Sequence, residues 1–142
     1  MKRVSWGVLG LSLLAGPVLA AQMTVYKSES CGCCQGWVEH MTTEGFELEV
    51  INSDNLAPIK AGAGVTPGLA SCHTALIDGY VIEGHVPAAD VRRLLEQRPA
   101  VKGLTIPGMP QSAPGMDMPG IPYEVLSFGE GDQTAVFSRY PG

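Results

Sequence analysis

The stretch MTVYKSESCGCC at residues 23–34 decides how this chain is expected to fold. Residues 23–27 alternate in polarity and are rich in strand formers, which predicts a strand. From residue 34 to about residue 44, apolar side chains recur at offsets of three and four, which predicts a helix. The junction between these elements contains three of the four cysteines of the chain, Cys31, Cys33 and Cys34. The sequence therefore places a dense group of thiols at the start of a helix.

The remaining elements are expected in an alternating order. Strands are predicted over residues 46–51, 73–77 and 80–83, helices over residues 52–61 and from Pro87 to Pro99, and a closing hairpin over residues 123–127 and 134–138. Asp78-Gly79 marks a two-residue hairpin turn, whereas residues 103–122 hold too many prolines and glycines for a helix or strand. With Cys-x-x-Cys spacing between Cys31 and Cys34, the order β-α-β-α-β-β-α predicts a single α/β domain. We expect this domain to have a thioredoxin-like fold, a long Pro/Gly/Met loop and a C-terminal hairpin.

Residues 1–20 have the composition of a secretory signal peptide. Lys2 and Arg3 precede an apolar stretch that is short for a membrane span, and small side chains lead up to Ala20. We therefore expect cleavage after Ala20, a mature domain of residues 21–142, a periplasmic location, and no membrane attachment after cleavage. Removing two cations would make the net charge of −5 more negative. Because no basic cluster remains, nucleic acid is not an expected partner.

The cysteines suit either thiol redox chemistry or a soft metal. Unpaired N–H groups and the helix dipole stabilise thiolates at a helix start, and the thiolate is the form that attacks disulfides or binds metals. Cys33 stands where the usual thioredoxin motif has a proline. A third thiol would interfere with a simple two-cysteine cycle, whereas it would give a metal a third soft ligand. Cys72 and His73 would complete a site of four sulfurs and one nitrogen if the fold brings them to the same end of the sheet.

Copper is the metal that these donors favour. Soft sulfur donors select Cu(I), Zn(II) or an iron–sulfur cluster. Zinc sites commonly use two well-separated ligand pairs, so zinc is the lesser alternative, and iron–sulfur assembly before export is not expected. Met109, Met116 and Met118 lie in the Pro/Gly loop. Their thioethers suit Cu(I), and Met116 and Met118 are candidate ligands; an equally weighted alternative is that these methionines pack the loop against the core.

Further motifs are distributed over the mature chain. They are Met23-Thr-Val-Tyr-Lys-Ser28, Cys31-Gly-Cys-Cys-x-x-Trp37 with His40 beyond it, Gly45-Phe46, Ser71-Cys-His-Thr-Ala75, Gly79-Tyr80, Glu83-Gly-His-Val-Pro-Ala88 and the Pro-Gly-Met repeats. Together they resemble the CopG-type periplasmic copper-resistance proteins. This resemblance implies a thioredoxin-like fold with a cysteine-bridged cluster of several copper ions. It implies Cys31, Cys33, Cys34 and Cys72 as ligands and His73 as nitrogen donor. It also implies a role in copper handling or copper redox chemistry, with copper ions and other periplasmic copper-handling proteins as partners.

Several side chains leave alternatives open. His85 could contact the cluster or cap the following helix, whereas His40 is expected at the surface rather than at the metal. Lys60 is expected to be a solvated charge, and Trp37 and Tyr80 are expected core residues.

The alternative function is a thiol–disulfide oxidoreductase. In that case Cys31 and Cys34 would be the catalytic pair, and Cys33 or Cys72 would resolve the mixed disulfide. The sequence therefore leaves open whether the protein is an enzyme.

Overall fold

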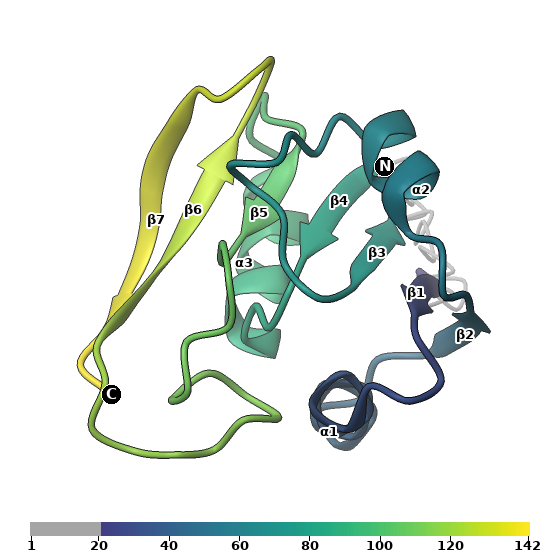
Figure 1. Cartoon of the computed structure of the whole chain (residues 1–142). Coiled ribbons are helices and arrows are strands. Elements are labelled where there is room, and N and C mark those ends of the chain that lie inside the picture. Colours follow the sequence, from purple (N-terminus) through teal and green to yellow (C-terminus); the bar gives the residue numbers. More distant parts are fainter. Residues whose placement is uncertain (1–20) are drawn as a thin grey trace, which may run out of the picture.

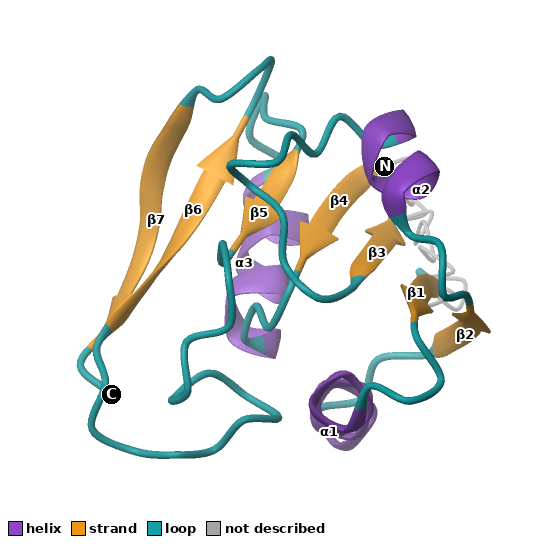
Figure 2. Ribbon diagram, in the orientation of Figure 1, coloured by secondary structure: helices purple, strands orange, loops and turns teal. Residues whose placement is uncertain are grey.

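A seven-stranded mixed sheet forms the centre of the protein (Figures 1 and 2). The computed structural model describes residues 21–142, so the expected signal peptide at residues 1–20 lies outside the described residues. The strands lie side by side in the order β2-β1-β3-β4-β5-β6-β7. In chain order the elements are β1 (Met23–Lys27), α1 (Gly32–Thr43), β2 (Leu48–Asn52), α2 (Ala57–Gly62), β3 (Thr74–Ile77), β4 (Tyr80–Glu83), α3 (Ala88–Gln97), β5 (Gly103–Thr105), β6 (Tyr123–Phe128) and β7 (Thr134–Tyr140).

The first helix joins two parallel strands. β1 and β2 pair in parallel, and α1 provides the crossover that such a pair requires. Trp37 and Met41 lie on the buried face of α1, which is the face that the spacing of three and four predicts. The helix begins at Gly32, two residues before the predicted start. As a result, Cys31 is the N-cap and Cys33 lies in the first turn.

β3 and β4 form the predicted hairpin. Asp78 and Gly79 have positive φ angles of 49° and 83°, as a type I′ turn requires at both central positions. Tyr80 is buried, as predicted. The register sets Thr74 opposite Glu83, so the residue before β3 and the residues after β4 lie at the same end of the sheet.

Different segments cover the two faces of the sheet. On one face, α1 and α3 enclose the main core, which includes Trp37 and Leu94. On the other face, Leu69 packs with Val81 and Phe128. Figure 1 shows the segment between α2 and β3 crossing in front of β4 and β5, while α3 lies behind them. The residue before β3 therefore reaches the sheet from the opposite side to α1.

The sheet has one strand more than the sequence predicts. β5 lies at the start of the Pro/Gly-rich region for which we expected no regular structure. A Cβ added at Gly103 would overlap the carbonyl oxygen of Val81, so glycine allows the backbone of β5 to approach β4 closely. Three residues are too few for alternation to be visible in a sequence, which is why this strand escaped prediction. The other predicted elements are present, with shifts at their ends.

Residues 106–122 form the long loop between β5 and β6. Figure 1 shows the loop reaching α1 before it returns to β6. Ala113 is fully buried. A Cβ added at Gly115 would lie 2.5 Å from Trp37 N and 2.8 Å from the carbonyl oxygen of Cys33. The loop backbone therefore rests directly on the first turns of α1, beside the cysteines.

The C-terminal hairpin of β6 and β7 is present as predicted and is anchored to α3. Asp90 of α3 is 3% exposed. It accepts hydrogen bonds from the Tyr140 hydroxyl at 2.6 Å and from the Ser138 hydroxyl. The hairpin is thus part of the domain rather than a separate appendage.

Two further observations concern residues 21–142. No peptide bond in this part of the chain is cis, so the Thr66–Pro67 bond is trans, and Thr66 donates a hydrogen bond to Asp132 in the β6–β7 turn. Within the same residues, no helix combines the length and the apolar character that a membrane crossing needs.

Candidate metal centre

The four cysteines converge at the N-terminus of α1. The sulfur atoms of Cys31, Cys33, Cys34 and Cys72 all lie within 4.8 Å of one another. Cys31 and Cys34 are joined by a disulfide, with their Cα atoms 5.3 Å apart, and Cys33 Sγ lies 3.5 Å from Cys31 Sγ. Cys33 and Cys72 are free thiols. The fold thus brings Cys72 to the same place as the cysteine turn, as the metal hypothesis requires.

The backbone of α1 favours negative charge on this group of sulfurs. Cys34 N donates a hydrogen bond to Cys31 Sγ at 3.3 Å, and the first turn of the helix contains no acidic side chain. The unpaired N–H groups of a helix start and the helix dipole stabilise thiolates. The reduced cysteines are therefore well placed to act as anionic ligands.

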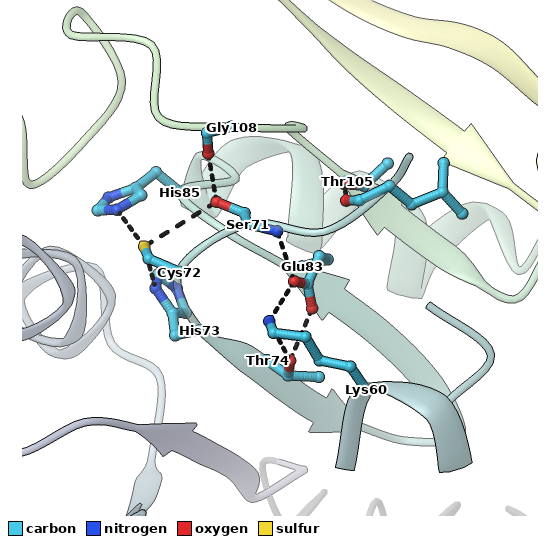
Figure 3. A network of polar contacts seen from close by, with 10 residues as sticks. Lys60, Ser71, Cys72, His73, Thr74, Glu83, His85, Thr105 and Gly108 are labelled. Carbon is cyan, nitrogen blue, oxygen red and sulfur yellow. Dashed lines mark hydrogen bonds and ion pairs between the residues drawn. The ribbon is translucent and has the colours of Figure 1, made fainter. Parts of the chain in front are cut away.

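Contacts of Ser71 hold the neighbouring Cys72 in position (Figure 3). Ser71 N donates a hydrogen bond to the Glu83 carboxylate at 2.7 Å, and the Ser71 hydroxyl donates to the carbonyl oxygen of Gly108. Gly84 has a φ of 77°, and a Cβ at this position would overlap the Ser71 side chain. Glycine here lets the chain leave β4 close to Cys72.

Two buried histidines flank Cys72 (Figure 3). His85 Nε2 lies 3.0 Å and His73 Nδ1 lies 3.4 Å from Cys72 Sγ. His85 Nδ1 lies 2.7 Å from the carbonyl oxygen of Pro114. A carbonyl oxygen can only accept, so Nδ1 carries the proton and Nε2 presents its lone pair to Cys72. Of the two roles considered for His85, the structure therefore shows a side chain at Cys72 rather than a helix cap.

Burial keeps this thiol and both imidazoles neutral. It raises the pKa of the Cys72 thiol to about 11 and lowers the pKa of His73 to about 3. Burial lowers the pKa of His85 as well. At neutral pH and without metal, Cys72 is therefore protonated and both imidazoles have a free lone pair. A cation that binds Cys72 must displace the thiol proton, so metal binding would release protons.

A fully buried carboxylate supports the Cys72 segment from inside the sheet (Figure 3). Glu83 is 0% exposed. It accepts hydrogen bonds from Ser71 N at 2.7 Å and from the Thr74 hydroxyl at 2.7 Å, and it forms an ion pair with Lys60. The prediction of a solvated Lys60 is wrong, because its side chain is only 15% exposed and α2 directs it onto Glu83. Sequence reasoning missed this network, and its only signal was one acidic residue at the end of an otherwise apolar strand.

The other predicted residues lie around the centre. His40 Nε2 accepts a hydrogen bond from Ala88 N at 3.2 Å, so this partly buried histidine caps α3 and is not the free surface residue that we expected. Met116 is partly buried, whereas Met109 and Met118 are 54% and 55% exposed. Packing against the core therefore does not explain Met109 and Met118.

The structure shows the oxidised form of the site. The disulfide engages two of the four sulfurs, and its reduction by two electrons and two protons would free all four thiols. Two sulfurs that share an ion through bonds of about 2.3 Å lie up to about 4.6 Å apart. Four sulfurs within 4.8 Å of one another could thus share soft ions, once reduction lets the sulfurs of Cys31 and Cys34 separate from their bonded distance.

Comparisons with known proteins give the family. The family described as proteins of unknown function, DUF411, matches residues 69–116, which include Cys72, both buried histidines and Glu83. A search of curated proteins gave no match. Two solved structures of the copper resistance protein CopG, forms 1 and 2, match with TM-scores of 0.81 and 0.80 and sequence identities of 36% and 34%. Each match covers 87% of this chain and 100% of the CopG chain. The chain therefore belongs to the CopG family of copper resistance proteins.

Proposed function

We propose that this protein binds copper as Cu(I) and holds more than one ion in a cluster of the Cys31, Cys33, Cys34 and Cys72 thiolates. The observation that carries the proposal is the convergence of four sulfurs from two distant segments at one helix start. Thiolates select Cu(I) among the metals that an exported protein meets, and zinc is the lesser alternative. Similarity to the CopG structures supports a role in copper resistance.

Further groups would complete the centre. His73 would provide a nitrogen donor and His85 a second one, while Met116 and Met118 would offer thioethers from the loop beside α1. The signal-like residues 1–20 support a periplasmic location, where other copper-handling proteins would deliver or receive the ions. The order and pairing of β1–α1–β2 and β3–β4–α3 support a thioredoxin-like core, which β5, β6 and β7 extend.

The stoichiometry of Cu(I) binding tests this proposal. Reduced protein is titrated anaerobically with Cu(I) against a chromogenic competitor, and bound copper is measured after desalting. We expect clearly more than one equivalent in the reduced wild type. The oxidised wild type is the matched control, because it has the same side chains but two thiols fewer. A Cys33→Ser/Cys34→Ser variant should lose most of the load, and an undiminished load in that variant would refute the ligand assignment.

The second candidate function is thiol–disulfide exchange by Cys31 and Cys34. The observation that favours it is the disulfide itself, which lies beside a third sulfur, since Cys33 Sγ is 3.5 Å from Cys31 Sγ. One reduced thiolate would attack a substrate disulfide, and a second would resolve the mixed disulfide, with transfer of two electrons. The same pair could also transfer electrons to copper. Oxidation of the two thiols to a disulfide would reduce two Cu(II) to two Cu(I) and release two protons. Turnover of a model disulfide by metal-free protein tests the exchange activity, and an inert protein would exclude it.

A further inference from the structure

We propose that Cys72, His73 and His85 form a second metal site, which takes one borderline divalent ion such as Zn(II) or Cu(II) and stays complete when Cys31 and Cys34 are oxidised. This proposal deepens the proposed function and rests on it for Cys72, His73 and His85, which are also donors of the proposed copper centre; its test in oxidised protein does not depend on Cu(I) binding. The three donors form a group of their own, with one ligand atom from each residue within 4.8 Å of the others.

The spacing of the donors fits a common ion. Zinc bonds sulfur at about 2.3 Å and imidazole nitrogen at about 2.0–2.1 Å in tetrahedral geometry, so a sulfur and a nitrogen on one ion lie about 3.5 Å apart. Cys72 Sγ lies 3.4 Å from His73 Nδ1 and 3.0 Å from His85 Nε2. Shifts of a few tenths of an ångström would therefore suffice.

Both imidazoles turn one ring nitrogen toward the Cys72 sulfur, His85 through Nε2 and His73 through Nδ1. The bond from His85 Nδ1 to the Pro114 carbonyl oxygen, at 2.7 Å, fixes the tautomer that exposes the Nε2 lone pair. Metal-bound histidines usually have such a partner on the other ring nitrogen. His73 is 0% exposed, and its Nε2 has no hydrogen-bond partner in the described chain. His73 Nδ1 faces Cys72 Sγ, so the hydrogen bonds of residues 21–142 leave Nε2 of this buried imidazole unpaired.

The rigid frame of the site does not include the disulfide. The β3–β4 hairpin joins Cys72 to His85, and Gly84 N donates to the His73 carbonyl oxygen at 3.0 Å. Glu83, the last residue of β4, holds the backbone of Ser71 in the segment that leads into β3. Oxidation of Cys31 and Cys34 removes two ligands from the four-cysteine cluster, whereas the site of Cys72, His73 and His85 loses none.

The donor types separate the two sites chemically. Four thiolates favour a soft monovalent ion, whereas two imidazoles and one thiolate suit Zn(II), Cu(II) or Co(II). Three protein ligands leave a fourth position for water or an exchanging ligand. Because Cys72 belongs to both groups, the oxidised protein would keep one bound ion after the thiolate cluster has lost two ligands.

Cobalt(II) is the probe that tests this site, since a thiolate ligand gives it a charge-transfer band and a tetrahedral site gives it intense visible bands. The protein to titrate is oxidised Cys33→Ser, in which Cys72 is the only free thiol. We expect one equivalent of Co(II), the thiolate band, and displacement by Zn(II). His85→Ala and Cys72→Ser should lose the band, while His40→Gln, whose histidine lies outside the group, should keep it.

The outcomes are distinct from those that test the Cu(I) cluster. If oxidised Cys33→Ser shows no thiolate band, or if His85→Ala keeps it unchanged, the second site does not exist. Circular dichroism verifies that each variant is folded. Oxidised wild type in which Cys33 is alkylated can replace Cys33→Ser in the Co(II) titration, because Cys72 is again the free thiol. A reduced wild type that binds no more than one Cu(I) would refute the cluster alone, and a Co(II) site in the oxidised protein would stand.

Discussion

Glu83 provides the sharpest test of how the Cys72 segment is held. The variant Glu83→Gln keeps the shape of the side chain and can keep its contacts with Ser71 N and the Thr74 hydroxyl, but it removes the charge that faces Lys60. Removing one partner of a buried ion pair costs about 3–5 kcal/mol, because the other charge stays buried without compensation. The Lys60 side chain is still 15% exposed and can reach some water. We therefore expect a loss of about 3 kcal/mol in the free energy of unfolding.

Urea unfolding of the metal-free, oxidised protein at neutral pH, followed by far-UV circular dichroism, measures this loss. With an m value of roughly 1.5 kcal/mol/M, the midpoint should fall by about 2 M. Glu44→Gln is the matched control, because the Glu44–Arg92 ion pair is 43% and 44% exposed, and its loss should cost less than about 1 kcal/mol.

The double variant Lys60→Met/Glu83→Gln separates the charge effect from packing. Removal of both charges should restore most of the stability lost in Glu83→Gln, with a coupling of about 1–3 kcal/mol. A midpoint of Glu83→Gln within experimental error of wild type would refute the reasoning. So would a double variant whose loss equals the sum of the two single losses.

Three further perturbations have defined outcomes. Gly115→Ala should detach the long loop from α1 and make the loop sensitive to protease. Gly120→Ala is the control, because Gly120 also has a positive φ but nothing lies within 4 Å of the added Cβ. Equal protease sensitivity of the two variants would contradict the packing of the loop on α1. Burial lowers the pKa of His40, so as pH falls through about 6.5 the unfolded chain binds a proton first and stability decreases. His40→Gln can still accept the hydrogen bond from Ala88 N but cannot titrate, so it should weaken the dependence of the free energy of unfolding on pH. Urea unfolding at several pH values measures this dependence, and the same dependence in His40→Gln and wild type would contradict the role of His40. The pKa of about 11 for Cys72 lowers its thiolate fraction about 100-fold but raises the nucleophilicity of the thiolate about 10-fold. Alkylation of Cys72 at mildly alkaline pH should therefore be roughly 10-fold slower than alkylation of a free thiol. Mass spectrometry of the alkylated protein measures this rate, and a rate equal to that of a free thiol would contradict the prediction.

Local patterns were sufficient to predict much of the framework. The helix after the cysteines, the Asp78-Gly79 hairpin and the closing hairpin all depend on neighbours within a few residues, and all are present. The predicted group of four cysteines also came together, because the cysteine turn and the residue before β3 lie at the same end of the sheet.

The contacts that sequence reasoning missed are long-range ones. Lys60 meets Glu83 across 23 residues, and His40 caps α3 across 48 residues. Neither residue has a local pattern that indicates its partner. The position of His85 likewise depends on Gly84 and on a carbonyl group in the long loop. The missing strand, β5, is too short to show a period and depends on the close approach of Gly103 to β4.

The route of the chain between β5 and β6 has a consequence for protein engineering. Both strands are neighbours in one sheet, so the two ends of the 106–122 segment are fixed close together whatever the segment does. Ala113 is buried and the backbone at Gly115 rests on the helix, but Met118 and Ile121 near the return of the segment are exposed. A fluorescent reporter peptide inserted between these two exposed positions should leave the sheet intact while sitting on the loop that rests on α1 beside the cysteines. The natural chain thus offers an attachment point for a reporter of the proposed copper centre.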